Sequence, residues 1–356
     1  MNIKPLSGAC AWKGENIVND SSWQFHFDAI DLVDLDEALL HAKNAGCDIR
    51  SVDRSLFPLD HLSQKLHDIS SVLEDGCGFA RLKSLPLDRW SMEDRELIWM
   101  GLASHIGVPV YQNYQGQLIR PITAERGDVG DRYGQLEMDS GQFLSSRART
   151  ASNSELRFHT DRCDVVALLC TGQAETGGDS RIASSVTVHN EMLKRAPELC
   201  KMLYEDLPRS RIGEEQGGET AWYYLPVWGV QNNKFTSHYS RTYVEALEYV
   251  SGAPQVSDVQ WKAMDMLAEL ADECALSMRL DPGDIQFLNN HVIYHSRGSY
   301  QDNPDKGLVR SLTRIWLCSP QRALPEKHKI LWGEVESGKI RGGIQQPIVS
   351  QQTIPN

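Results

Sequence analysis

Short strand-like runs in the second half of the chain restrict its fold more than any other feature. They are rich in β-branched, aliphatic and aromatic residues and cover residues 164–170, 180–188, 221–230, 284–290 and 310–317. Turn sequences such as GGD and PGD separate them. Many short strands divided by turn signals are typical of antiparallel sandwiches and barrels. The pattern therefore predicts an antiparallel β core, with helices inserted at 189–204 and 257–278.

The first quarter of the chain differs, because its apolar residues recur at helical spacing. Residues 29–46 and 60–74 both follow this period, and each run ends at or just before a glycine, which predicts two helices. A third helical pattern covers 91–107, where Ser91 suits the N-cap. Strand-like runs at 78–86 and 107–111 flank it. We therefore expect a mainly β protein with helical additions, of the α+β class.

The 356 residues are enough for two modest domains or one large, elaborated domain. We expect a mostly helical N-terminal region (1–75) packed on a core with inserted helices and loops (76–325), followed by a C-terminal extension (326–356). Residues 112–154 show no clear period and predict a long loop, a kind of segment that is often functional. The polar, uncharged segment 342–356 predicts a loosely ordered tail, and an arm packing on a neighbouring subunit remains the alternative.

Charge and cysteine content narrow the classes of function. With 48 acidic and 36 basic residues the formal charge is −12, so no surface for nucleic acid or anionic lipid is expected. No apolar run is long enough to span a membrane, and the N-terminus lacks the pattern of a secretory signal. None of the eight cysteines forms a C-x-x-C pair. These features predict a cytoplasmic protein with reduced thiols, and leave a homo-oligomer open.

Histidine and an acidic residue two positions apart can hold a metal when both lie on one strand. Such triplets occur at 26–28, 159–161 and 189–191. The third begins a predicted helix, where positions two apart diverge, and the first lies beside no other metal-competent cluster. His159 and Asp161 instead end an extended segment, and His295 follows in a second strand-like region. Two histidines and one carboxylate form the facial triad of non-haem Fe(II) oxygenases, which leaves three coordination positions open.

Two arginines follow His295 on a strand-like run. Arg310 and Arg314 are four residues apart, so an extended strand points both to one side, roughly 13 Å apart. Buried guanidinium groups are costly unless each meets an anion, and their planar fork suits a carboxylate. The run therefore predicts binding of two anions, or of two carboxylates, within one site.

With these motifs the sequence resembles the TauD/TfdA family of Fe(II)- and 2-oxoglutarate-dependent dioxygenases. The matching motifs, in the family's order, are FHTD (158–161), TGGDS (176–180), GD-x-x-F-x-NN (283–290), YHSR (294–297) and R-x-x-x-R (310–314). The resemblance covers about half the chain, and the motifs are specific together although each is weak alone. It implies a double-stranded β-helix, or jelly-roll, core in which His159, Asp161 and His295 bind the iron.

The resemblance also implies a reaction and further site residues. Arg310 would bind the distal carboxylate of 2-oxoglutarate with the Ser180 hydroxyl beside it, and Arg314 would lie near an anionic group of the substrate. The interval between His295 and Arg310 is at the long end of the family's range, so the alternative that Arg314 binds the co-substrate and Arg310 is structural remains open. Oxidation of a C–H bond, most simply hydroxylation, would consume 2-oxoglutarate and O2 and release succinate and CO2. The substrate would be a small molecule carrying a carboxylate or similar anion.

Weaker candidates and two other classes of protein remain. Gln112 and Asn113 follow a strand where relatives place a substrate-contacting loop, although ordinary loop polarity explains them equally well. Arg297 is predicted either to reach the substrate or to pair with surface carboxylates. His291 is expected to be structural. The alternatives to the main prediction are a non-haem iron oxidase or oxygenase that does not use 2-oxoglutarate, and a non-catalytic jelly-roll module that binds a metal or an anion.

Overall fold

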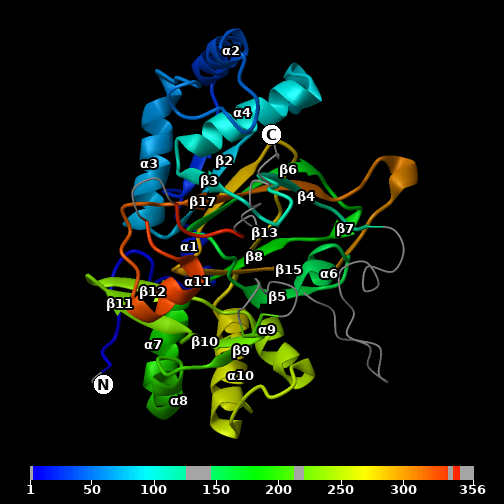
Figure 1. Ribbon diagram of the computed structural model, residues 1–356. Coiled ribbons are helices and arrows are strands. Elements are labelled where there is room, and N and C mark those ends of the chain that lie inside the picture. Colours follow the sequence, from blue (N-terminus) through cyan, green and yellow to red (C-terminus); the bar gives the residue numbers. More distant parts are fainter. Residues whose placement is uncertain (1–2, 126–145, 212–219, 336–339, 345–356) are drawn as a thin grey trace, which may run out of the picture.

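Two β-sheets form the centre of the computed structural model, which describes residues 3–125, 146–211, 220–335 and 340–344 (Figure 1). The larger sheet has the order β1 (Gln24–His26), β2 (Phe79–Lys83), β14 (Ile285–Asn289), β6 (Val165–Gly172), β17 (Ser311–Cys318) and β3 (Val108–Val110), and β4 (Ile119–Ile122) also pairs with β17. The smaller sheet has the order β13 (Leu276–Met278), β8 (Ser180–Ser184), β15 (Ile293–Arg297) and β5 (Leu156–His159). All pairs except β1–β2 are antiparallel. The predicted double-stranded β-helix core is confirmed.

Helices cover the outer faces of both sheets (Figure 1). Against the larger sheet lie α3 (Leu62–Glu74) and α4 (Met92–Ser104), with α2 (Ala29–Asn44) packed on α4. Against the smaller sheet lie α7 (Ser185–Arg195) and α10 (Asp258–Glu273), with α8 (Pro197–Met202) packed on both of these helices. The other helices of the described residues are α1 (Gly14–Ile17), α6 (Ser146–Thr150), α9 (Arg241–Glu245), α11 (Lys329–Trp332), and the 3-10 turns at Leu87–Arg89, Ala246–Tyr249, Pro304–Lys306 and Glu326–His328. The other strands described form three antiparallel two-stranded pairs, β7 (Thr176–Gly177) with β16 (Tyr300–Gln301), β9 (Pro208–Ser210) with β10 (Trp222–Tyr224), and β11 (Trp228–Gln231) with β12 (Lys234–Ser237).

Alternation along the central strands separates two hydrophobic cores. On β17, Ile315 and Leu317 pack with the helices α2, α3 and α4, whereas Leu312 and Trp316 belong to the core on the other face of the sheet. Successive side chains of a strand project to opposite faces, so a strand covered on both faces is apolar throughout. Arg314 interrupts this apolar run at an inward-facing position. Arg314 therefore projects to the same face as Leu312 and Trp316, away from α3 and α4, and the candidate site lies on this face.

Several predicted boundaries are wrong for identifiable reasons. The strand expected at 180–188 ends at Ser184, because the Ser184 hydroxyl accepts a hydrogen bond from the Thr187 amide and starts α7. The strand expected at 221–230 is divided into β10 and β11, with Pro226, which has no amide proton, between them. The helix expected at 257–278 ends at Glu273.

The long loop expected at 112–154 contains regular structure in its described part. Strand β4 pairs with β17, and α6 lies near its end, while residues 126–145 lie outside the described residues. The tail expected at 342–356 is described only as far as residue 344. There the amides of Gly343 and Ile344 donate to the carbonyls of Arg162 and Tyr111, so this start of the segment packs on the core.

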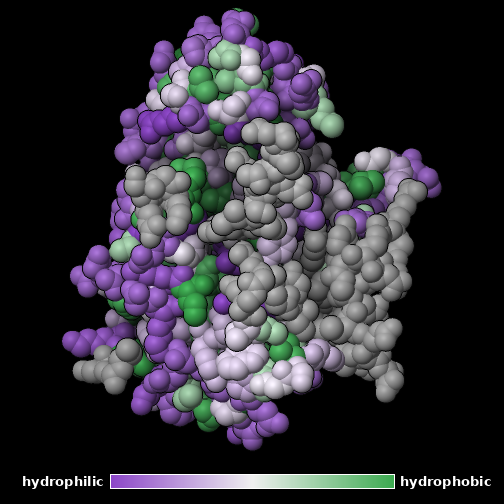
Figure 2. Space-filling model, viewed as in Figure 1, coloured by the Kyte–Doolittle hydropathy of each residue, from purple (hydrophilic) through white to green (hydrophobic). Residues whose placement is uncertain are grey.

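The surface is largely hydrophilic on the face shown in Figure 2. Hydrophilic side chains cover most of the coloured surface there, and hydrophobic ones appear in small groups. No helix among the described residues is long and apolar enough to cross a membrane. All eight cysteines lie in the described part of the chain and are free thiols.

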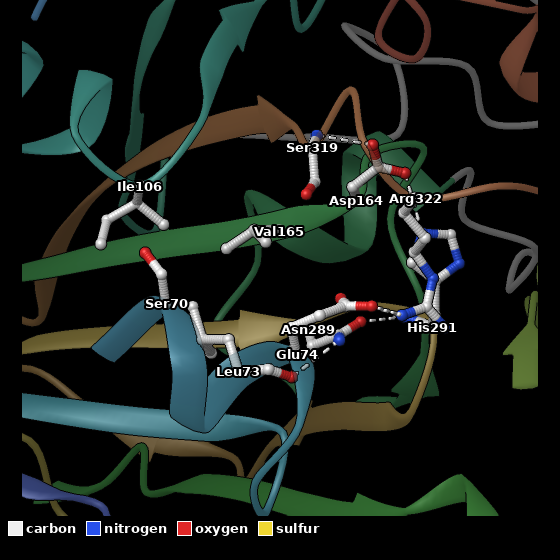
Figure 3. Close-up of a pocket in the computed structure, with 10 residues that line it drawn as sticks. All are labelled: Ser70, Leu73, Glu74, Ile106, Asp164, Val165, Asn289, His291, Ser319 and Arg322. Atoms are coloured by element: carbon white, nitrogen blue, oxygen red, sulfur yellow. Dashed lines mark hydrogen bonds and ion pairs between the residues drawn. The ribbon is translucent and has the colours of Figure 1, made fainter. Parts of the chain in front are cut away.

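A buried polar network joins the C-terminal extension to the core around a small pocket (Figure 3). The Asp164 carboxylate accepts hydrogen bonds from His291 Nε2 at 2.8 Å, the Ser319 amide at 2.7 Å and Arg341 Nη2 at 3.0 Å. Arg322 pairs with Glu74 of α3 at 2.9 Å. Burial lowers the pKa of His291 to about 4, and the charge of Arg322 adds to this, although Asp164 opposes it. His291 is therefore neutral in the folded protein at neutral pH, as befits the structural histidine that the sequence predicts.

We expect the His291→Gln variant to lose less stability on acidification than the wild type. The unfolded chain binds a proton at this histidine below pH 6.5, whereas the folded protein binds it only near pH 4, so stability falls as the pH drops between these values. The resulting loss in the free energy of unfolding is at most about 3 kcal/mol. Urea unfolding at pH 7 and pH 5 measures it, with His67→Gln, at an exposed histidine of α3, as the control. If wild type and His291→Gln lose the same amount of stability between pH 7 and pH 5, His291 does not have a lowered pKa in the folded protein.

Candidate metal centre

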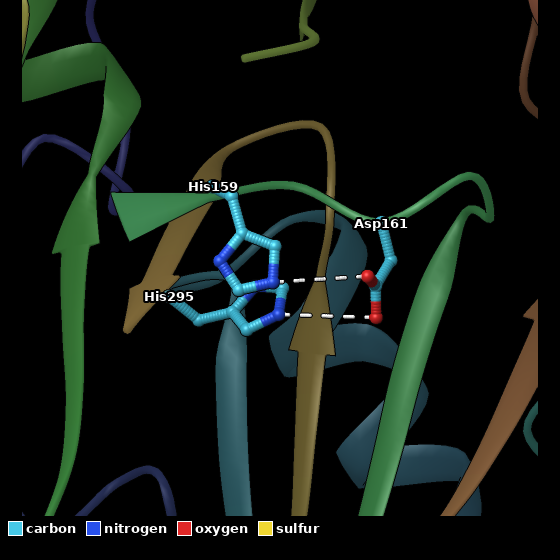
Figure 4. A group of neighbouring side chains, drawn as sticks. All are labelled: His159, Asp161 and His295. Carbon is cyan, nitrogen blue, oxygen red and sulfur yellow. Dashed lines mark ion pairs between the residues drawn. The ribbon is translucent and has the colours of Figure 1, made fainter. Parts of the chain in front are cut away.

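Three side chains predicted from the sequence converge at one end of the smaller sheet (Figure 4). His159 is the last residue of β5 and pairs in register with His295 on the neighbouring strand β15. Asp161 follows in the segment that leaves β5. His159 Nε2 lies 3.8 Å from Asp161 Oδ1, and His295 Nε2 lies 3.9 Å from Asp161 Oδ2. The strand ends sooner than expected, yet it still brings both residues of the triplet to one point.

The surroundings set the histidines in the form that a metal requires. His159 Nδ1 lies 2.9 Å from the Arg157 carbonyl, which can only accept, so Nδ1 carries the proton and Nε2 keeps its lone pair. Burial lowers the pKa of His159. Burial and the neighbouring His159 lower the pKa of His295 to about 3. Both rings are therefore neutral at neutral pH, and neutral imidazole is the metal-binding form.

Asp161 stays ionised although it is buried. Burial alone would raise the pKa of its carboxyl group, but Arg314 and the two histidines outweigh burial and lower this pKa to about 2. Arg314 Nη1 donates to Asp161 Oδ2 at 2.8 Å, and Trp316 Nε1 donates to the same oxygen at 2.9 Å. Oδ1 is free of these donors. Each carboxylate oxygen thus faces one histidine, and Oδ2, the oxygen nearer His295, is also held by Arg314 and Trp316.

These three residues suit a metal ion in donor type and spacing. One ligand atom from each residue lies within 4.8 Å of the other two. Metal bonds to nitrogen and oxygen of about 2.1 Å require only a small contraction of this cluster. Two neutral imidazoles and one carboxylate are the donor set of mononuclear non-haem Fe(II) sites, which leave three positions for other ligands. The residues present therefore fit an iron ion.

Asn290 holds the backbone that carries Asp161. Its Oδ1 accepts from the Asp161 amide at 3.1 Å, and its Nδ2 donates to the Asp161 and Cys163 carbonyls, the latter at 2.9 Å. Asn290 is fully buried, so water does not satisfy these groups. The residue lies in the NN motif at 289–290, which the sequence singles out without giving Asn290 a role.

Arg314 is fixed by a residue that the sequence also selects. Gln112 Oε1 accepts from Arg314 Nε at 2.8 Å, and Gln112 Nε2 donates to the Arg314 carbonyl at 2.7 Å. The guanidinium group also lies over the Trp316 ring, with 4.7 Å between Cζ and the ring centroid. Arg314 Nη2 makes no hydrogen bond with the described residues. Sequence reasoning missed Trp316, although it lies two residues after Arg314 and thus on the same face of β17.

Arg310 lies in a second buried polar region, built around the glycine turn before β8. Arg310 Nε donates to the Gly178 carbonyl at 3.0 Å, and a Cβ on Gly178 would lie 2.7 Å from Arg310 Cδ. Gly178 also has a φ of +78°, so only glycine is tolerated there without strain. The Ser180 hydroxyl donates to Gln286 Oε1 at 2.8 Å and so connects the two sheets. Buried Arg310 Nη1 has no hydrogen-bond partner in the described part of the chain.

The structure places the weaker candidates as follows. Asn113 Oδ1 accepts from the amides of Gln115 and Gln117, both at 3.1 Å, so this side chain is engaged within its own turn. Arg297 is 4% exposed, which excludes pairing with surface carboxylates. Its Nη2 donates to the Ser152 carbonyl at 2.9 Å and also to the Ser154 carbonyl.

One expectation about the other triplets is wrong. Asp28 of the 26–28 triplet does lie beside other metal-competent groups, because Asp31 and His61 are within 4.8 Å of it. However, the Lys65 ammonium group contacts the carboxylates of Asp28 and Asp31 and already compensates their charge. His189, in the 189–191 triplet, lies in α7 as predicted, where its Nε2 is 2.9 Å from the Tyr204 hydroxyl.

Comparison with known proteins gives both a family and structural relatives. The model of the family described as "Taurine catabolism dioxygenase TauD, TfdA family" matches residues 53–316. FR-33289 synthase of Streptomyces rubellomurinus is 28% identical over 319 residues, covering 88% of this chain and 90% of the relative. The taurine hydroxylase-like protein SAT17 of Stachybotrys chartarum is 26% identical over 315 residues, covering 87% of this chain and 79% of the relative.

Solved structures of two oxygenases share the fold. An asparagine oxygenase in complex with Fe(II), (2S,3S)-3-hydroxyasparagine and succinate has a TM-score of 0.62 and 18% identity, covering 83% of this chain and 93% of that one. The non-heme iron oxygenase OrfP, in complex with Fe, succinate and (3S)-hydroxy-L-Arg, has a TM-score of 0.59 and 16% identity, covering 83% of this chain and 94% of that one.

The Asn290→Ala variant tests the part played by the backbone around Asp161. We expect metal affinity to fall by about 10- to 100-fold, the usual cost of losing a group that orients a ligand. The matched control is Asn289→Ala, because Asn289 is also buried but bonds to the Leu73 carbonyl and the His291 amide instead. Both variants should lower the melting temperature, and only Asn290→Ala should weaken Co(II) binding in a calorimetric titration. Equal metal affinities in the two variants would show that Asn290 does not support metal binding through the backbone around Asp161.

Proposed function

The chain belongs to the TauD/TfdA family of dioxygenases, and on this premise we propose that it hydroxylates a C–H bond of a small anionic molecule. His159, Asp161 and His295 hold Fe(II), and Arg310 with Ser180 binds the distal carboxylate of 2-oxoglutarate. The reaction consumes O2 and 2-oxoglutarate and releases succinate and CO2. The observation that carries the proposal is the convergence of two neutral imidazoles and one ionised carboxylate within 4.8 Å.

The bound iron would supply the activation of O2 and the oxidising power of the reaction. The part of the protein is to arrange the groups around it. His159 and His295 would hold the iron through Nε2 atoms that the register of β5 and β15 places side by side. Arg314 and Trp316 donate to Asp161 Oδ2, so Oδ1 is the oxygen that would be left to hold the iron. Three protein ligands of these types would leave room for the co-substrate and O2.

The two arginines of the motif have different surroundings, and this difference supports the proposed division of roles. Arg310 lies beside the Gly178 carbonyl in the turn that leads to Ser180, away from any contact with Asp161. Arg314 contacts Asp161 directly. A molecule paired with Arg314 would therefore lie next to the iron, where the reacting C–H bond must be, whereas the distal end of the co-substrate extends away from the metal.

An anionic substrate is supported by the free donor of Arg314. Nε and Nη1 are taken by Gln112 and Asp161, which leaves Nη2 for a further acceptor. A guanidinium group held this rigidly loses little freedom on binding a carboxylate. The structural relatives were solved with hydroxylated amino acids, which carry such a carboxylate. The substrate class that suits this chain best is therefore a small molecule with a carboxylate or an equivalent anion.

Anaerobic titration of the protein with Fe(II) and then 2-oxoglutarate tests the proposal. Chelation of iron by the keto acid should produce a weak visible charge-transfer band that saturates at one equivalent. Iron binding without this band would favour an iron oxidase that does not use 2-oxoglutarate. A band without succinate release, for any substrate tried under air, would favour a non-catalytic binding module.

Alanine variants of the three proposed ligands should bind substantially less iron than the wild type. Removal of one donor from a three-residue site leaves two ligands, which hold Fe(II) weakly. Iron content after anaerobic loading and desalting measures this. The control is His291→Ala, which removes a buried histidine from the turn before β15, where it pairs with Asp164 and not with the cluster. Full iron occupancy in any one of His159→Ala, Asp161→Ala or His295→Ala would remove that residue from the set.

The Arg310→Ala and Arg314→Ala variants should affect different ligands. We expect Arg310→Ala to raise the KM for 2-oxoglutarate by about 100-fold, because a buried charge-assisted pair is lost. Arg314→Ala should act mainly on the KM and turnover of the prime substrate. Steady-state assays of succinate release, with each compound varied in turn, separate the two effects. The reverse order would show that the roles of the two arginines are exchanged.

A further inference from the structure

Arg297 is placed by its strand on the wall of the co-substrate site. It lies on β15 two residues after His295, so the alternation of the strand points both side chains to one face. In the antiparallel pair of β15 and β8, Arg297 is directly opposite Ser180. Opposed residues of such a pair project to the same side. The Arg297 side chain therefore lies beside the hydroxyl proposed to contact 2-oxoglutarate.

Arg297 and Arg310 form a pair of buried cations on one aromatic ring. The Cζ atoms of Arg297 and Arg310 lie 4.9 Å and 5.3 Å from the centroid of the Tyr300 ring. The two residues are 4% and 7% exposed. Neither forms a salt bridge with a carboxylate among the described residues. Two like charges that share a buried site repel each other, so the arrangement lacks an anion.

Unpaired nitrogens show where this anion would bind. Arg297 Nε and Nη1, together with Arg310 Nη1, are buried and have no hydrogen-bond partner in the described part of the chain. The other terminal nitrogen, Arg297 Nη2, is already used by the carbonyls of Ser152 and Ser154. One edge of the guanidinium group is thus anchored to the backbone, and the rest is left for a ligand. Buried donors without acceptors are rare in folded proteins and call for an explanation.

Electrostatics agrees with a missing anion. The guanidinium groups of Arg297 and Arg310 are almost fully buried and lie over the same Tyr300 ring, so little hydration reaches them and their like charges repel each other. A carboxylate placed between the two arginines would reverse both effects, because it replaces lost hydration and screens the repulsion.

We propose that Arg297 is a second binding residue for the distal carboxylate of 2-oxoglutarate, which it holds together with Arg310. This inference rests on the proposed function, because it assigns the anion to the co-substrate of that reaction. It gives the distal carboxylate two cations instead of one. The protein would consequently discriminate strongly between 2-oxoglutarate and keto acids of equal length that end in a methyl group.

Binding of two keto acids to the Arg297→Gln variant tests this role. Iron-loaded protein is titrated under anaerobic conditions with 2-oxoglutarate and with 2-oxopentanoate, which has the same carbon chain but no distal carboxylate. In the variant we expect the affinity for 2-oxoglutarate to fall by about 10- to 100-fold, and that for 2-oxopentanoate by less than about threefold. Calorimetry of succinate binding gives a second readout that does not depend on turnover.

Two further variants complete the experiment. Arg297→Lys keeps the charge but not the planar fork, so it should retain more affinity than Arg297→Gln and serves if the latter fails to fold. Arg181→Gln is the matched control, because Arg181 lies on the opposite face of β8 and pairs with Asp272 at 2.8 Å. It should leave both affinities unchanged.

The outcomes distinguish this inference from the proposed function. An equal loss of affinity for both keto acids would mean that Arg297 acts only through the carbonyls of Ser152 and Ser154, and would overturn the inference. Unchanged binding of 2-oxoglutarate would also overturn it. If wild-type iron-loaded protein binds 2-oxopentanoate as well as 2-oxoglutarate, no distal carboxylate is recognised, and the inference fails while iron binding stands. If the wild type binds neither keto acid, the proposed function itself fails.

Discussion

The carboxylate of Asp161 is the group on which the rest of the site depends. It is buried, so it stays ionised only because a guanidinium group, an indole N–H and two imidazoles surround it. These partners come from both sheets: His159 and His295 belong to the smaller sheet, and Arg314 and Trp316 belong to the larger one. A charged group in an apolar interior is stable only when all its neighbours are correctly placed. The packing of the two sheets and the metal centre therefore require each other.

Two mechanical features keep this arrangement in place. The register of β15 against β5 sets the two histidines side by side, with 4.2 Å between the centroids of their rings. Asn290, in the turn that precedes β15, fixes the segment with Asp161 through three hydrogen bonds. Beyond this segment, Asp164 connects the core to the C-terminal extension through Arg341. The rigidity of the centre thus comes from the backbone contacts of polar side chains as well as from the hydrophobic cores.

The three arginines around the candidate site differ in the hydrogen-bond donors that they have free. Two nitrogens of Arg314 donate hydrogen bonds to Asp161 and Gln112, so one nitrogen remains for a ligand. Arg297 and Arg310 have no carboxylate partner among the described residues, and they share the Tyr300 ring. Arg314 therefore has one free nitrogen beside Asp161, whereas Arg297 and Arg310 have three buried nitrogens without a partner among the described residues. This distribution suits the two anions of the proposed function, a substrate and a co-substrate bound at different positions.

The sequence by itself determined the type of core, and it predicted the three proposed metal ligands and the two arginines, because these depend on local periodicity and on short motifs. Tertiary structure alone decided the rest. In the folded protein Arg314 contacts Asp161, 153 residues away, and Gln112 fixes Arg314, whereas Asn113 forms hydrogen bonds within its own turn. Arg297 is buried beside Arg310 instead of lying at the surface. Neither can be read from spacing along the chain, because both depend on which strands become neighbours and on which side chains are left without a partner once the sheets have packed.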